Sequence, residues 1–311
     1  MNTGAAIGGS EPRTQKPPHD AAALDLTGSE MNAAPAPADR HDWSDLGLRI
    51  LSSIILIPAG LFAARAGGPW LAGAAGAAVV AMSYEWARMS EPNGIRFAFP
   101  FALAGALGAV MLASWREWGL AAGWLCLCAA ASATRRRSAS GIVETAGGLL
   151  YIGSPAAVFL WLRARAPEGW ETVLTLFLVI WAADVAAYFG GKLIGGPKVA
   201  EGLSPNKTWS GIIAGAFSGC AAGLGCAALF GSHSYGAWAG VGLALAFTGL
   251  MGDLFESFLK RRFGVKDASR LIPGHGGVLD RIDGLMAATL LTGAVLALWP
   301  PLSAFLTGAG P

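Results

Sequence analysis

The chain has 311 residues, of which 54% are hydrophobic and only 14% are charged, and its formal net charge is +2. Because a soluble domain usually carries about 25% charged residues, this composition excludes an ordinary water-soluble globular protein. The 44 glycines are typical of transmembrane helices that approach one another closely. We therefore expect one all-α, polytopic integral membrane helical bundle, with no nucleic acid among its partners.

The N-terminal segment differs from the rest of the chain. Residues 1–43 are polar and rich in Ala and Pro, without an apolar stretch near Met1 that would mark a signal peptide. Low hydrophobicity without periodicity predicts a disordered segment. We therefore predict a disordered cytoplasmic tail over residues 1–43 and a transmembrane domain over residues 44–311, with the run from about Leu46 as an uncleaved signal anchor.

Apolar runs of the length that a membrane-spanning helix needs, about 20 residues, follow one another to the end of the chain. We predict about nine transmembrane helices, and their ranges are approximately 46–64, 69–88, 97–114, 118–134, 145–163, 170–192, 209–230, 235–258 and 285–306.

Basic residues are distributed unevenly between the loops that join these runs. Of the 22 Lys and Arg residues, only Arg65, Arg116, Arg163 and Arg165 fall on one side, and the remaining 18 fall on the side of the N-terminus. Cytoplasmic loops carry an excess of Lys and Arg. The N-terminus is therefore predicted to be cytoplasmic and the C-terminus to lie outside, which an odd number of spans requires.

The first polar segment on the cytoplasmic side covers residues 181–211. Asp184 lies within an apolar helix, where an ionisable residue indicates either a functional site or a structural pair between helices. Further along, glycines alternate with lysines before Ser204 and Lys207. Glycines let backbone N–H groups approach phosphate and Lys supplies charge, which suits a nucleoside triphosphate. A basic cytoplasmic loop beside anionic lipid has a similar composition, so both interpretations stay open.

The second polar segment covers residues 252–284 and joins the last two predicted spans. Asp253, Ser257 and Lys260 lie on one stripe of a helix, and Asp280 and Asp283 share a face at the start of the next. Two helix ends would therefore present carboxylates toward each other across a basic, Gly-rich loop. Carboxylate oxygens are the ligands that Mg²⁺ prefers, together with substrate phosphates.

This second segment resembles the signature of the phosphatidate cytidylyltransferase (CDP-diacylglycerol synthase) family, without a gap or a substitution. The resemblance extends from about Leu46 to the end of the chain and includes Asp253, the Asp184 helix and residues 204–208. The signature residues are Ser257, Lys260, Arg261, Lys266, Asp267, Pro273, His275, Gly276, Gly277, Asp280, Arg281 and Asp283.

The resemblance implies a Mg²⁺-dependent transfer of a cytidylyl group from CTP to phosphatidic acid, which gives CDP-diacylglycerol and pyrophosphate. It also implies a homodimer in a bacterial inner membrane, with the site facing the cytoplasm. The catalytic residues would be Asp253, Ser257, Lys260, Asp280 and Asp283, and the metal ligands Asp253, Asp280 and Asp283. The substrate-binding residues would be Asp184, Ser204, Lys207, Lys266, Asp267, His275 and Arg281.

Two positions depart from the family pattern. Ser210 stands where the resemblance implies a Glu, and Gly284 stands where Ser is common.

Three other functions remain open. A transporter also has intramembrane acids and broken helices, but here the acids gather at one membrane face. An enzyme for another lipid phosphate is a closer alternative, because apolar walls discriminate poorly between lipid chains. A lipid kinase would need a base for the hydroxyl group, and His275 is the obvious candidate.

Overall fold

The structure is a computed structural model, and it describes residues 43–91, 94–135, 138–165, 168–200, 202–269, 271–272 and 276–300. The predicted tail lies outside these residues except for Trp43, and so does His275.

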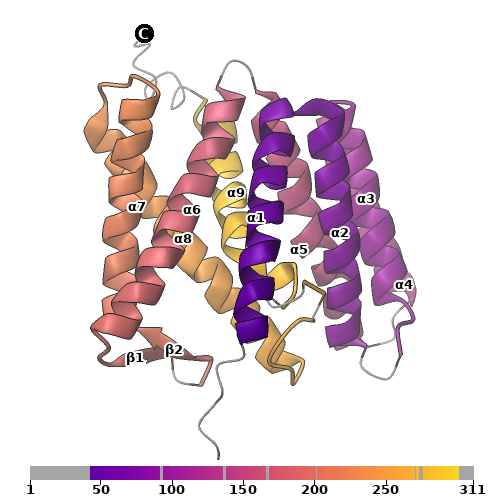
Figure 1. Cartoon of the computed structure of the whole chain (residues 1–311). Coiled ribbons are helices and arrows are strands. Elements are labelled where there is room, and N and C mark those ends of the chain that lie inside the picture. The colour runs from indigo at the N-terminus through magenta and orange to yellow at the C-terminus, as the bar shows by residue number, and fades with distance from the viewer. Residues whose placement is uncertain are drawn as a thin grey trace, which may run out of the picture. The chain divides into compact units, whose positions relative to one another are not determined.

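Helices make up nearly all of the described chain, which confirms the prediction of an all-α membrane fold apart from one small hairpin (Figure 1). Each of the nine predicted apolar runs corresponds to one helix. The elements are α1 Trp43–Ala66, α2 Gly68–Ser90, α3 Ala98–Ser114, α4 Trp118–Arg135, α5 Ala139–Ala164, α6 Gly169–Leu193, β1 Lys198–Ala200, β2 Ser204–Thr208, α7 Trp209–Leu229, α8 Tyr235–Arg262 and α9 Leu279–Leu298.

Five of these helices, α5 to α9, are long and apolar enough to cross a membrane. Within the described residues, α3 and the segment Ile54–Ala66 of α1 are shorter apolar helices. The chain is therefore a helical, multi-pass membrane protein by length and composition. Nine spans and a cytoplasmic N-terminus stay predictions.

The boundaries of α8 and α9 differ from the predicted ones in a way that matters for the site. The sequence predicts a last span that begins at residue 285, whereas α9 begins at Leu279, and α8 continues to Arg262 instead of residue 258. Hydropathy alone ends a span at its first charged residues. A helix can nevertheless include acids in its first turn, where they are favourable, and bases in its last. Asp280 and Asp283 consequently lie in the first turns of α9.

Glycines on α7 allow this helix to pack closely between α6 and α8. A Cβ atom built on Gly211 would lie 2.7 Å from the backbone oxygen of Ala187 on α6, and one on Gly219 would lie 2.8 Å from the oxygen of Gly242 on α8. Contacts that short do not occur for real side chains. The four-residue spacing of Gly211, Gly215, Gly219 and Gly223 therefore sets the distance between these three helices.

A second close crossing joins α8 to α9 next to the predicted site. A Cβ on Gly252 would lie 2.6 Å from the backbone oxygen of Asp283, and one on Gly284 would lie 3.2 Å from the oxygen of Gly249. Gly284 is the position where the family pattern commonly has Ser. A glycine there lets the backbones approach, and the residue before it, Asp283, is brought against α8.

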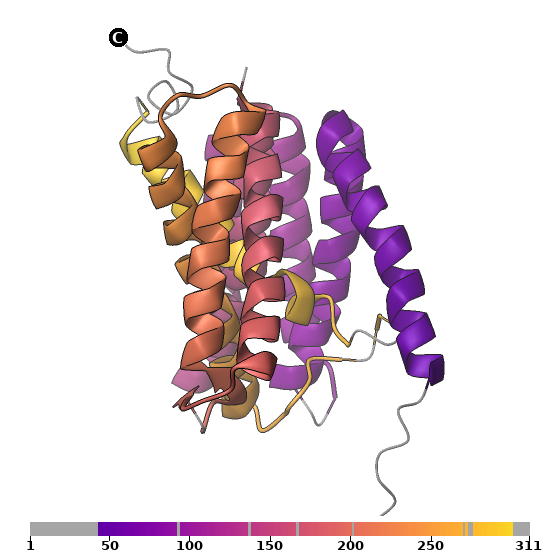
Figure 2. The same cartoon turned by 60° about the vertical axis from the view of Figure 1, so that its left-hand side comes forward.

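The strands β1 and β2 form an antiparallel hairpin that the sequence did not predict. Lys198 pairs with Thr208 and Ala200 with Ser204. The strand residues lack the alternation of apolar and polar side chains that signals a strand, so the sequence alone predicts a loop here. Thr208 Oγ1 accepts the N–H of Gly211 and caps α7. The hairpin and the α8–α9 connection lie at the same end of the helices (Figure 2).

Candidate active site

Three carboxylates meet where α8 ends and α9 begins. One oxygen each from Asp253, Glu256 and Asp283 lies within 4.8 Å of the others. Asp253 and Glu256 are three residues apart and share a face of α8, and the close crossing at Gly252 brings them to Asp283 on α9. Like charges this close repel one another, so the cluster needs cations.

Lys260 supplies one of these cations. Its Nζ lies 2.9 Å from Glu256 Oε2 and 3.0 Å from Asp280 Oδ1. The other oxygen of Asp280, Oδ2, accepts the N–H of Gly277 at 3.0 Å. Both oxygens of Asp280 therefore have partners. Glu256 is 1% exposed, and its Oε1 has no hydrogen-bond partner among the described residues, so this oxygen is available to a further cation.

Lys207 supplies a second cation from the hairpin. Its Nζ lies 2.6 Å from Asp253 Oδ2, and its side chain is 17% exposed. Ser257 Oγ donates to the other oxygen of Asp253 across 3.5 Å. The hairpin thus places a lysine of the predicted phosphate-binding segment directly on the acidic cluster, although Lys207 and Asp253 are 46 positions apart in the sequence.

All five predicted catalytic residues lie at this place. Asp253, Ser257, Lys260, Asp280 and Asp283 all lie on the facing ends of α8 and α9, as their spacing predicts. The roles that the resemblance implies for them, including a metal-ligand role for Asp280, stay predictions.

The predicted substrate-binding residues are placed less uniformly. Asp184 on α6 lies within electrostatic reach of Asp253, Lys207 and Arg281. Arg281 is exposed on α9, Lys266 and Asp267 are exposed in the α8–α9 connection, and Ser204 faces Ala200 in the hairpin. His275 lies outside the described residues.

Ser210, which stands in place of the expected Glu, has a structural role here. Its Oγ donates to the backbone oxygen of Gly195 and lies 3.0 Å from Thr208 Oγ1. Ser210 therefore ties the turn before β1 to the cap of α7.

Glu256 is the residue of this site that the sequence analysis missed. The signal was present, because Glu256 follows Asp253 by three positions and precedes Lys260 by four, on the same helical stripe. In the structure it is the most buried acid of the cluster.

A small cavity of about 150 Å³ lies beside the cluster, between α2, α5 and α8. Aromatic rings form much of its wall, and Arg262 is its basic residue. Tyr151 belongs to this wall and lies within electrostatic reach of all three clustered carboxylates, and its buried hydroxyl has no hydrogen-bond partner among the described residues. The aromatic lining residues are Trp86, Tyr151, Phe255 and Phe263.

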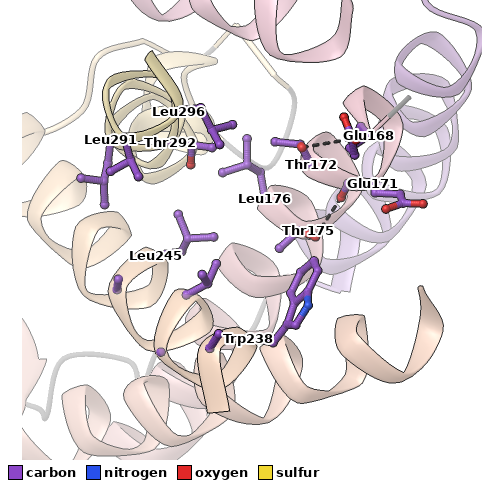
Figure 3. Close-up of a pocket in the computed structure, with 15 residues that line it drawn as sticks. Glu168, Glu171, Thr172, Thr175, Leu176, Trp238, Leu245, Leu291, Thr292 and Leu296 are labelled. Atoms are coloured by element: carbon purple, nitrogen blue, oxygen red, sulfur yellow. Dashed lines mark hydrogen bonds between the residues drawn. The ribbon is translucent and has the colours of Figure 1, made fainter. Parts of the chain in front are cut away.

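A larger cavity of about 350 Å³ lies at the opposite end of α8 and α9 and contains none of the predicted site residues. Leu176, Leu245 and Leu296 point into it (Figure 3). The hydroxyls of Thr172 and Thr175 donate to helix carbonyls one turn earlier, at 3.0 and 2.8 Å, and the remaining charged side chains of the lining are those of Glu168 and Glu171. Size alone therefore does not identify the active site.

Comparison with known proteins identifies the family to which the chain belongs. A family model described as the cytidylyltransferase family matches residues 47–299, a range that includes every member of the acidic cluster. The chain belongs to the cytidylyltransferase family.

Curated relatives extend this match along most of the chain. A phosphatidate cytidylyltransferase of Brucella suis biovar 1 is 41% identical over 262 residues, which cover 82% of this chain and 95% of the relative. Proteins of the same name from Rickettsia bellii and Staphylococcus aureus are 36% and 43% identical over 151 and 131 residues. These cover 45% and 41% of this chain, and 63% and 50% of the two relatives. The family resemblance noted in the sequence is thereby confirmed.

Proposed function

We propose that the protein transfers a cytidylyl group from CTP to phosphatidic acid and releases CDP-diacylglycerol and pyrophosphate. The observation that carries this proposal is the cluster of Asp253, Glu256 and Asp283 with Lys207 and Lys260, at the ends of two membrane helices. Such a place is accessible both to a water-soluble nucleotide and to a lipid headgroup at the membrane surface. The names of the curated relatives support the choice of substrates.

The reaction needs charge neutralisation more than it needs a base. An oxygen of the lipid phosphate forms a bond to the α-phosphorus of CTP, and the bond from that phosphorus to the bridging oxygen breaks. The electron pair leaves with pyrophosphate. The attacking phosphate is already anionic, so positioning and electrostatic stabilisation dominate. Lys207 and Lys260, whose side chains are partly buried, are cations that the site offers for this purpose.

The residues present fit a divalent cation. Three carboxylates gather within 4.8 Å, and Glu256 Oε1 is a buried oxygen without a hydrogen-bond partner in the described part of the chain. We propose that Asp253, Glu256 and Asp283 hold Mg²⁺, with Asp280 as a further ligand that the family pattern suggests. Bound Mg²⁺ would neutralise phosphate charge and orient the nucleotide.

The remaining substrate contacts are assigned by place and chemistry. Arg281, Lys266 and His275 are proposed to bind phosphates, Ser257 to donate a hydrogen bond, and Ser204, Asp267 and Asp184 to complete the nucleotide side of the site. The aromatic cavity with Arg262 is proposed to take the glycerol end of the lipid.

In the cell, we propose that the protein crosses the inner membrane nine times. The site and the N-terminus then face the cytoplasm and the C-terminus lies outside. We also propose that the protein forms a homodimer.

A direct assay tests this function. Detergent-purified protein is given radiolabelled CTP, phosphatidic acid and Mg²⁺, and the label extracted with lipid is measured beside an Asp280→Asn variant. We expect label in the lipid phase with the wild-type protein and little with the variant. If folded wild-type protein transfers label to another lipid phosphate but not to phosphatidic acid, that lipid phosphate replaces phosphatidic acid as the proposed substrate. Transfer to neither would overturn the proposed function.

A further inference from the structure

A buried acid outside the signature segment holds that segment in place. Glu85 lies on α2 and is 0% exposed. Its Oε1 accepts the N–H of Val278 at 2.8 Å and the hydroxyl of Ser269 at 2.6 Å, and its Oε2 accepts the N–H of Leu279 at 2.8 Å. One carboxylate thus binds three groups that lie 184 to 194 positions away in the sequence.

Two of these groups, the N–H groups of Val278 and Leu279, lie at the start of α9, and the third, the hydroxyl of Ser269, lies in the α8–α9 connection. The first backbone N–H groups of a helix have no partner within the helix, and a carboxylate next to them is favoured by both hydrogen bonding and the helix dipole. Glu85 takes the N–H groups of Val278 and Leu279, and Asp280 takes the preceding one, of Gly277. The start of α9 is therefore fixed from two sides.

Gly277 fits between these two acids because it lacks a side chain. A Cβ at this position would lie 2.9 Å from Glu85 Oε1, 3.1 Å from Asp280 Oδ2 and 3.1 Å from Ala268 Cβ. The second glycine of the signature thus lets Glu85 and Asp280 approach the same turn of backbone. The contact between α2 and the α8–α9 connection is a close, polar fit in an otherwise apolar region.

We infer that Glu85 is a positioning residue for the acidic site. By fixing the first turn of α9, it sets where the carboxylates of Asp280 and Asp283 lie relative to Glu256 and Lys260 on α8. Glu85 itself touches none of these four side chains in the structure's hydrogen bonds and ion pairs among the described residues. The catalytic consequence rests on the proposed function and the effect on metal binding on the metal site proposed with it, whereas the effect on the start of α9 rests on neither.

The chain supplies a matched control in Glu91. Its carboxylate also binds the first backbone N–H groups of a helix. At the start of α3, Glu91 Oε2 accepts the backbone N–H of Arg96 at 2.7 Å and that of Ala98 at 3.2 Å. Both acids hold a helix N-terminus, but α3 carries no residue of the site. Glu85→Gln and Glu91→Gln therefore make the same chemical change at two helix starts.

The test compares these variants by three measurements on detergent-purified full-length protein: hydrogen exchange of residues 276–284, Mn²⁺ binding by electron paramagnetic resonance, and turnover. We expect Glu85→Gln to speed exchange at the start of α9 and to weaken Mn²⁺ binding about 10-fold. Turnover should fall about 100-fold, because a displacement of the order of 1 Å has that cost. Glu91→Gln should leave Mn²⁺ affinity and turnover within about twofold of the wild type, as surface changes usually do.

Ser269→Ala is the milder variant in case Glu85→Gln does not fold. It removes the hydroxyl that donates to Glu85 and accepts the N–H of Leu271, and it leaves the carboxylate in place. Because two of the three hydrogen bonds to Glu85 remain, we expect faster exchange and Mn²⁺ binding weakened only about threefold. Wild-type Mn²⁺ affinity in folded Glu85→Gln, or in Ser269→Ala if the first variant does not fold, would overturn the inference. Equal losses in Glu91→Gln would also overturn it, because they would indicate general destabilisation.

The metal and exchange measurements keep this inference separate from the proposed function. If the wild-type protein makes no CDP-diacylglycerol but Glu85→Gln still weakens Mn²⁺ binding, the positioning role stands and the substrate assignment fails. If the wild type is active and Glu85→Gln has wild-type turnover and Mn²⁺ affinity, the positioning role fails alone.

Discussion

At one end of the α8–α9 pair, three acids and two lysines lie within a few ångströms of one another. At the other end, a mainly apolar lining that also contains Glu168 and Glu171 surrounds a cavity of about 350 Å³. Both ends belong to the same two helices. The polar end has the smaller cavity beside it, of about 150 Å³, and the apolar end has the larger one. What distinguishes them is therefore which side chains the helix ends carry, and not how much space they enclose.

The comparison also shows how charge is made tolerable within a membrane helix. At the polar end, Lys260 contacts Glu256 and Asp280, and Lys207 contacts Asp253, so these three acids each have a lysine beside them. At the apolar end, the threonine hydroxyls are satisfied by their own helix. Unpaired charge is costly in an apolar setting. The polar end needs partners from three elements, and this makes its function sensitive to geometry.

The largest effect is expected from Asp283→Asn at the polar end. This change keeps the size of the side chain but removes one of three clustered negative charges. We expect cytidylyl transfer to fall about 1000-fold, comparable to the loss of a main electrostatic group in other enzymes. The labelled-CTP assay measures it, with Mg²⁺ titrated to high concentration. Activity close to that of the wild type would show that the polar end is not the active one.

A smaller but still large effect is expected from Gly252→Ala. The added Cβ would meet the backbone oxygen of Asp283 at 2.6 Å and Ala287 at 2.8 Å, so α8 and α9 must move apart. Because displacements of about 1 Å can cost about 100-fold in rate, we expect a loss of that size. Gly240→Ala is the matched control on α8, since its Cβ would meet nothing within 4 Å. Equal activities of the two variants would contradict the role of the close crossing.

Glu256→Gln sharpens the comparison further, because it tests the acid that the sequence analysis missed. The amide keeps a hydrogen-bonding group near Lys260 but removes the charge of the buried oxygen Oε1. We expect Mn²⁺ affinity to fall about 10-fold, within the range for groups next to a metal. Electron paramagnetic resonance measures it. Unchanged affinity together with lowered turnover would show that Glu256 acts through Lys260 and not as a ligand.

The sequence predicted helices and their order well, because apolar runs of membrane length leave few alternatives. It also predicted that the ends of α8 and α9 meet, from the spacing of Asp253, Lys260 and Asp280. It failed where hydropathy gives no signal. The β1–β2 hairpin has no apolar alternation. The last predicted apolar span begins six residues after the start of α9, because acids in a first turn lower the hydropathy without ending the helix, although the spacing of Asp280 and Asp283 had already placed them at the start of this helix.

The contacts between distant segments were beyond the reach of sequence patterns. Nothing in the spacing of residues places Lys207 on Asp253, and nothing links Glu85 to Val278 across 193 positions. Both contacts depend on how α2 and the hairpin pack against α8 and α9. Local rules describe neighbours on one helix face, but they contain no information on which helices are adjacent.

The smallest effect is expected from filling the apolar cavity at the far end. Gly240→Leu places an apolar side chain at a position that lines the cavity and has open space around its Cβ. Nothing at that end pairs with the acidic cluster, so we expect turnover and Mn²⁺ affinity within about twofold of the wild type. The two measurements used for the polar end check this. A loss of 10-fold or more in a well-folded variant would mean that the large cavity holds part of the lipid during the reaction. The two ends would then form one functional unit, because a ligand that occupies the far cavity is coupled to the site only if it is itself a substrate or displaces α8 against α9.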